Sequence, residues 1–126
     1  MVMRESRSLP RFLEHGTGGW FKGMDPSYPL PKIRESWVAG AAIVYIGKAA
    51  GRHGLRQRLR QLVRFGYGEP IGHRGGRMLW QLADSRALTV RWRACGQGEA
   101  RRLEAEAIAA SMSEHAGRRP FANKQG

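Results

Sequence analysis

The chain has 126 residues, with 22 Lys and Arg against 10 Asp and Glu, so its formal net charge is +12 and its pI is about 11.4. This length fits one domain with its own core, and a composition of 41% hydrophobic and 25% charged residues excludes wholesale disorder. The single cysteine, Cys95, excludes an intramolecular disulfide and favours a reducing cytoplasm. The charged N-terminal residues lack the apolar core of a signal peptide, and no apolar run approaches the ~20 residues of a membrane span. We therefore expect one cytoplasmic domain over residues 1–126, with no membrane partner.

In the N-terminal half, residues 1–36 are predicted to be irregular because glycines and prolines interrupt them repeatedly, with one short strand or extended piece at residues 19–22. Residues 42–46 are β-branched or aromatic apart from Ala42 and are followed by Gly47, which predicts a strand buried on both faces. Residues 54–65 change to helical spacing. The apolar stripe of this predicted helix consists of Leu55, Leu59, Leu62 and Val63.

In the C-terminal half, glycines predict a loop over residues 66–76, and residues 78–83 fit a short helix or a strand. Alternation over residues 88–93 predicts a half-buried strand. Residues 97–115 are rich in Ala, Glu, Arg and Leu and end before Gly117 and Pro120, which predicts a helix. The order of elements is that of a small α+β domain with helices packed on a small sheet.

The positive charge is concentrated in residues 48–77, which hold eight Lys and Arg but one carboxylate, Glu69, a local excess of +7. Such an excess points to a polyanion, because Lys and Arg that neutralise phosphates release condensed counterions. Nucleic acid is the expected partner, with DNA favoured over RNA; a solvated basic surface and association with ribosomes are the alternatives. The arginines predicted to hold the phosphate backbone are Arg52, Arg56, Arg60, Arg64, Arg74 and Arg77.

Two charged residues fall on apolar faces of the predicted helices. At 100° per residue Glu104 lies in the middle of the face formed by Ala100, Leu103, Ala107, Ile108 and Ser111. A carboxylate there is costly unless it is paired or binds a cation, so the alternatives are an ion pair with an Arg and a metal ligand. Arg58 lies at the rim of the apolar stripe of the basic helix, either as a packed stem with its head in water or as a functional group.

Four sequence blocks in this order resemble the GIY-YIG nuclease superfamily. They cover residues 42–123, the motif-bearing core that follows the irregular residues 1–36. The blocks are Tyr45-Ile46-Gly47-Lys48-Ala49, then Gly54-Leu55-Arg56-Gln57-Arg58-Leu59, then Leu103-Glu104, then Pro120-Phe121-Ala122-Asn123.

The resemblance implies a three-stranded antiparallel sheet flanked by helices and a phosphodiester hydrolase that uses one divalent ion, Mg²⁺ or Mn²⁺. It implies that Tyr45 orients or deprotonates the attacking water, with help from Lys48. It also implies that Arg58 stabilises charge on the phosphoryl oxygens, that Glu104 binds the metal and that Asn123 braces the site. These roles agree with the chemistry of a metal and an arginine at a developing oxyanion. Apart from the resemblance, Tyr45 fits a core aromatic and Asn123 a turn residue.

No GIY tripeptide stands upstream of Tyr45, and the nearest candidate for that strand is Gly18-Gly19-Trp20-Phe21. This alignment puts Trp20 where the family has its first tyrosine, so that hydroxyl is either missing or supplied by Tyr28. This departure keeps a second hypothesis open beside the endonuclease, namely a non-catalytic nucleic-acid-binding module of the same fold. A third is a protein-interaction domain whose charge serves solubility. The sequence predicts no separate DNA-reading domain, so high sequence specificity would require a homodimer or another protein.

Overall fold

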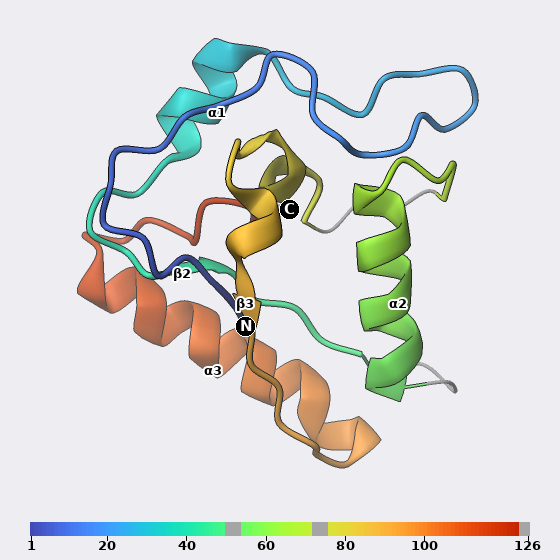
Figure 1. Ribbon diagram of the computed structural model, residues 1–126. Helices are drawn as coiled ribbons and strands as arrows, with labels where there is room; N and C mark the ends of the chain where they lie inside the picture. Colours follow the sequence, from blue (N-terminus) through green and yellow to red (C-terminus); the bar gives the residue numbers. More distant parts are fainter. Residues whose placement is uncertain (50–53, 72–75, 124–126) are drawn as a thin grey trace.

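The computed structural model describes residues 1–49, 54–71 and 76–123 (Figure 1). Three short strands, β1 (Val2–Met3), β2 (Ile43–Tyr45) and β3 (Thr89–Val90), form an antiparallel sheet in the order β2-β1-β3. The helices are α1 (Leu30–Ser36), α2 (Gly54–Gly66) and α3 (Gln97–Glu114), with two 3₁₀ helices, η1 (Arg77–Gln81) and η2 (Ser85–Ala87). This confirms the predicted α+β class with a three-stranded antiparallel sheet flanked by helices.

The prediction of a strand at residues 19–22 is wrong. The first strand is β1, whose Val2 pairs with Tyr45 on one side and with Val90 on the other. Phe21 instead forms a local bridge with Met24 across Lys22 and Gly23, both at positive φ. Two consecutive residues in this conformation make a tight turn, so the segment reverses before it can extend into the sheet.

The prediction that residues 1–36 are irregular is also wrong for α1. Pro29 caps this helix and Pro31 lies in its first turn. Proline is tolerated there because the first N–H groups of a helix have no intrahelical acceptor, so these prolines start a helix instead of breaking one. Ile33 is fully buried and anchors α1 to the core.

The two predicted long helices are confirmed, with one change in the apolar stripe of α2. Leu62 and Phe65 are buried, whereas Val63 is 47% exposed. Residues 78–83, for which helix and strand were both open, contribute most of η1. The predicted strand over residues 88–93 shortens to β3, because residues 91–96 leave the sheet as an exposed connection to α3.

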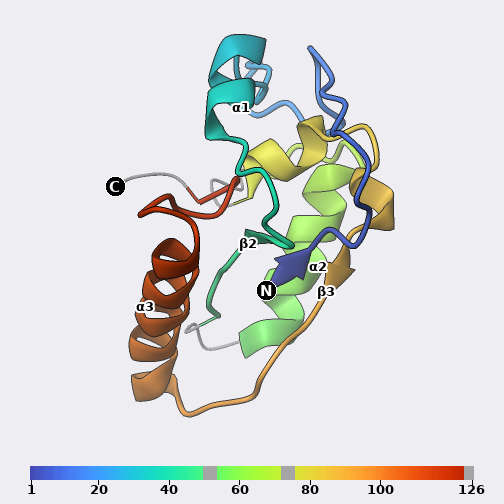
Figure 2. The same ribbon diagram turned by 90° about the vertical axis from the view of Figure 1, so that its left-hand side faces the viewer.

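The strands lie between α2 and α3, and the N-terminal loop crosses over the top of the molecule (Figures 1 and 2). Phe65, Leu79 and Leu82 are almost completely buried in the core. Gln81 is buried among them and holds the long N-terminal loop to it. Its Oε1 accepts from the Tyr28 N–H at 2.8 Å, and its Nε2 donates to the carbonyls of Tyr28 at 2.9 Å and Leu13 at 3.2 Å.

Candidate active site

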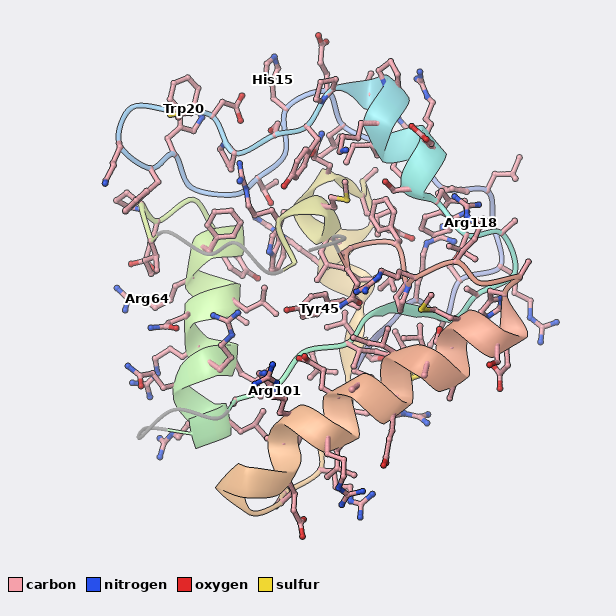
Figure 3. The ribbon with its side chains drawn as sticks, turned by 180° about the vertical axis from the view of Figure 1, so that it is seen from behind. His15, Trp20, Tyr45, Arg64, Arg101 and Arg118 are labelled. Atoms are coloured by element: carbon pink, nitrogen blue, oxygen red, sulfur yellow. The ribbon has the colours of Figure 1, made fainter. Side chains whose placement is uncertain are left out.

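Tyr45 is the last residue of β2, and Figure 3 shows its side chain in the space between α2 and α3. The residue is half-buried. Burial raises the pKa of its phenol above the ordinary value; a charge interaction and a hydrogen bond with Arg58 lower that pKa, and the negative charge of Glu104 raises it. The net pKa is raised, so the hydroxyl is protonated at neutral pH. Residues from three elements therefore act on one hydroxyl group.

Arg58 reaches Tyr45 from the inner side of α2. The side chain is half-buried, in contrast to its exposed neighbours Arg56 and Arg60. A guanidinium has five N–H donors, so one hydrogen bond to a phenol leaves others available for a phosphate. The inward orientation that the helical projection predicted for Arg58 is what the burial pattern shows.

Glu104 reaches the same place from α3. It is half-buried on the face that also carries the buried residues Ala100 and Ser111. The ion pairs found within residues 1–49, 54–71 and 76–123 do not include Glu104. The alternative of a rim carboxylate paired with an arginine is therefore not what these residues display. Glu106, two residues away, is exposed and paired with Arg102 at 2.9 Å.

Gly47 is required by the position of the Tyr45 ring. A Cβ atom on Gly47 would lie 2.8 Å from Cε2, 2.9 Å from the hydroxyl oxygen and 3.1 Å from Cζ of Tyr45. Real Cβ contacts essentially never fall below 3.0 Å. The ring is thus folded back over the backbone of Gly47, and any side chain at residue 47 would displace it.

Asn123 braces the backbone between Tyr45 and Gly47. Its Oδ1 accepts from the Ile46 N–H and its Nδ2 donates to the Ile46 carbonyl, each at 2.8 Å. The adjacent Ala122 N–H donates to the Val44 carbonyl, also at 2.8 Å. The side chain therefore pairs with Ile46 as a neighbouring strand would. Asn123 is a positioning residue, since its amide bonds to the backbone of Ile46.

The basic residues predicted to hold a phosphate backbone differ in their exposure and in their partners. Arg56 and Arg60 are exposed on α2, and Arg64 is exposed but bound to both oxygens of Glu69, at 2.7 and 3.0 Å. Figure 3 shows Arg64 pointing away from Tyr45. Lys48 is exposed just beyond Gly47. Arg52 and Arg74 lie outside the described residues.

Arg77, which is also predicted to contact a phosphate, has partners in the N-terminal loop. Its Nη2 donates to the Pro26 carbonyl at 2.7 Å, and its guanidinium lies 5.1 Å from the centre of the Tyr28 ring. The side chain is engaged within the protein, where it holds the N-terminal loop against η1. A phosphate contact by Arg77 stays a prediction.

Sequence reasoning missed Arg101. Figure 3 shows this residue near the start of α3, on the side that faces α2. It precedes Glu104 by three residues, which places the two about 60° apart on the helix. The same projection that singled out Glu104 would have identified Arg101. It adds a cationic group to the space between the two helices.

The strand position opposite Tyr45 carries no hydroxyl. Val2 is the register partner of Tyr45, and it is buried. Trp20, which the sequence placed nearest to a GIY strand, lies instead in the exposed loop of residues 20–24 (Figure 3). Residues 18–21 are therefore not the strand next to β2, which is β1.

The candidate site offers few side chains that could bind a metal ion. Within the described residues, no group of three or more His, Cys, Asp and Glu is placed to hold a metal ion. Mg²⁺ keeps several waters and is typically held by one or two carboxylates together with substrate phosphates. Glu104 as a single carboxylate therefore fits an ion shared with a bound phosphate.

Comparison of the chain with protein-family models, with curated proteins and with solved structures found no match. None of the helices in the described part of the chain has the length and apolar character needed to span a membrane.

Proposed function

We propose that the protein is a metal-dependent endonuclease that hydrolyses phosphodiester bonds in nucleic acid, with DNA as the favoured substrate. The observation that supports the proposal is the placement of half-buried Arg58 on α2 and half-buried Glu104 on α3, whose charges both influence the pKa of Tyr45 at the end of β2. A phenol, a guanidinium and a carboxylate between two helices are the groups that phosphoryl transfer uses to orient water, neutralise charge and hold a divalent ion.

Each residue has a distinct role in this proposal. Arg58 donates to the non-bridging oxygens of the scissile phosphate, where negative charge develops during the attack of water. The protonated hydroxyl of Tyr45 orients the attacking water, and exposed Lys48, three residues further on, contributes positive charge. Glu104 would hold Mg²⁺ or Mn²⁺, which would supply Lewis-acid stabilisation of the developing charge. Asn123 and Gly47 fix the backbone and ring position of Tyr45.

The experiment is nicking of supercoiled plasmid DNA by the purified protein with and without Mg²⁺. We expect nicking that requires Mg²⁺ and falls by about 10²–10³-fold in Glu104→Ala, in the range for the loss of one electrostatic group at a reacting centre. Glu106→Ala is the matched control, because Glu106 is an exposed carboxylate on the same helix. Nicking by Glu104→Ala at the rate of the parent protein would refute the role of Glu104.

A second candidate function is binding of nucleic acid without cleavage. It is favoured by Val2, which stands opposite Tyr45 where a second hydroxyl is absent. This candidate predicts salt-dependent binding to DNA and no nicking at any concentration of Mg²⁺. A flat dependence of affinity on salt would remove both candidates and leave the protein-interaction domain, because each phosphate contact in duplex DNA contributes about −0.9 to the slope.

A further inference from the structure

The outward surface of α2 is a stripe that the proposed reaction does not use. Arg56, Arg60, Val63 and Tyr67 fall within about 60° of one another at 100° per residue, and Arg58 lies on the opposite side of the helix. Tyr67 follows α2 directly and continues its pattern, since its N–H donates to the Val63 carbonyl at 3.0 Å. We call these four residues the outer stripe. From Arg56 to Tyr67 it extends about 17 Å at 1.5 Å per residue.

The outer stripe becomes aromatic at its C-terminal end. Tyr67 is 61% exposed, and Arg86 lies 4.7 Å from the centre of its ring. Trp20 is 59% exposed, in a loop that is seated on the same end of α2. The Gly19 N–H donates to the Phe65 carbonyl at 2.8 Å, and a Cβ on Gly19 would lie only 1.8 Å from the Glu69 carbonyl oxygen.

The turn that follows Trp20 exposes the side chains of Phe21, Lys22 and Met24. Phe21 and Met24 bond to each other in both directions, N–H to carbonyl, at 3.1 and 3.0 Å, across a two-residue turn. Lys22 in that turn has a φ of 54°, a left-handed conformation that residues other than glycine rarely adopt. Its ammonium lies 5.6 Å from the centre of the Phe21 ring. The turn thus holds an aromatic ring, a cation and the exposed Met24 at its tip.

We propose that the outer stripe and Trp20 bind an unpaired strand of nucleic acid, so that the substrate is a duplex with a single-stranded segment next to the cut. This inference rests on the nucleic-acid partner of the proposed function. The stripe combines the two features that single-strand binding needs, cations for the phosphates in Arg56 and Arg60 and exposed rings for the bases in Tyr67 and Trp20.

The geometry favours a single strand over a duplex. Tyr45 and Arg58 lie on the inner side of α2 and the outer stripe lies on its opposite side, and α2 with its side chains is about 10–12 Å across. A duplex has a persistence length of about 50 nm and does not turn around one helix. A single strand does so readily. Nucleic acid that reaches both surfaces therefore becomes unpaired between them.

The test measures the affinity of the full chain for two probes, a short oligothymidylate and a blunt duplex of the same length, by fluorescence anisotropy. We expect Trp20→Ala and Tyr67→Ala each to weaken oligothymidylate binding by roughly ten-fold or more, since stacking on one ring is typically worth that much. Tyr67→Phe is the matched control, because it keeps the ring, and it should bind as the parent does. Arg56→Gln with Arg60→Gln should lower the salt slope for the single strand by about 1.4.

The outcomes separate this inference from the nuclease. Oligothymidylate binding that is lost in the Trp20 and Tyr67 variants supports the inference, whether or not the protein nicks plasmid. Unchanged binding in the combined Trp20→Ala and Tyr67→Ala variant overturns it, even if nicking depends on Glu104. If the parent sediments as a dimer and the combined variant as a monomer, with equal oligothymidylate binding, the surface is an interface between copies and the inference is also overturned.

Discussion

Replacement of Asn123 tests how the C-terminal segment holds the candidate active site in place. Asn123→Ala removes two hydrogen bonds of 2.8 Å to the backbone of Ile46, a residue that is only 4% exposed. At about 0.5–1.5 kcal/mol for each bond the loss of unfolding free energy should be about 1–3 kcal/mol. For a domain of this size that corresponds to a fall in Tm of roughly 4–12 °C.

Asn123→Asp sharpens the test, because it keeps the acceptor for the Ile46 N–H and removes the donor to the Ile46 carbonyl. At neutral pH the carboxylate faces that carbonyl, so the variant should be at least as unstable as Asn123→Ala. As pH falls through an ordinary Asp pKa of about 4, protonation restores an O–H donor. The difference from the parent, measured by urea unfolding at each pH, should therefore shrink in acid for Asp and stay constant for Ala. Equal stability of all three proteins at pH 7 would refute the brace.

Three further predictions concern the ring of Tyr45, its charge state and the core. Gly47→Ala should reduce the nicking rate by about 10²-fold, because the ring of Tyr45 must move away from a Cβ at 2.8 Å and a misplacement near 1 Å can lower a rate by that factor. A Gly47→Ala variant that nicks at the parent rate would show that the ring position is not needed. The pKa of Tyr45, followed as tyrosinate absorbance against a Tyr45→Phe control, should fall in Glu104→Gln and rise further in Arg58→Gln, and opposite shifts would contradict the proximity of the three groups. Because the pKa of Tyr45 is raised in the folded protein, its contribution to stability should be retained below about pH 10 and decline as pH rises above that value. Gln81→Leu should destabilise the protein by about 2–4 kcal/mol in thermal unfolding, because it removes three hydrogen bonds of a buried side chain. A loss below about 0.5 kcal/mol would show that the loop does not depend on Gln81.

Sequence patterns predicted the parts of the fold that depend on local periodicity. The apolar spacing in α2, the helix formers in α3 and the β-branched run in β2 each act over a few neighbouring residues. The first strand could not be found in this way, because β1 has two residues and exists only through pairing of Val2 with Tyr45 and Val90. The prolines of α1 misled the prediction, since proline breaks a helix interior but is accepted in its first turn.

In the candidate site too, features that depend on local spacing could be predicted, whereas contacts between residues distant in the chain could not. Arg58 and Glu104 could be singled out because helical projection turns both inward, and the structure brings them to Tyr45. The internal engagement of Arg77 could not be predicted, because its partners Pro26 and Tyr28 are about 50 residues away in the chain. Charge counting likewise grouped the arginines of α2 together. The burial of the helix in the structure separates Arg58 on its inner side from Arg56 and Arg60 in the outer stripe.

The most direct test of the central claim is a comparison of plasmid nicking rates in Mg²⁺ for the parent, Tyr45→Phe, Glu104→Gln and the double variant. If Tyr45 and Glu104 act on one phosphate, the double variant should be about as slow as the slower single variant, because residues that act as a unit are not additive. Losses that multiply in the double variant, or a double variant as fast as the parent, would contradict a shared active site.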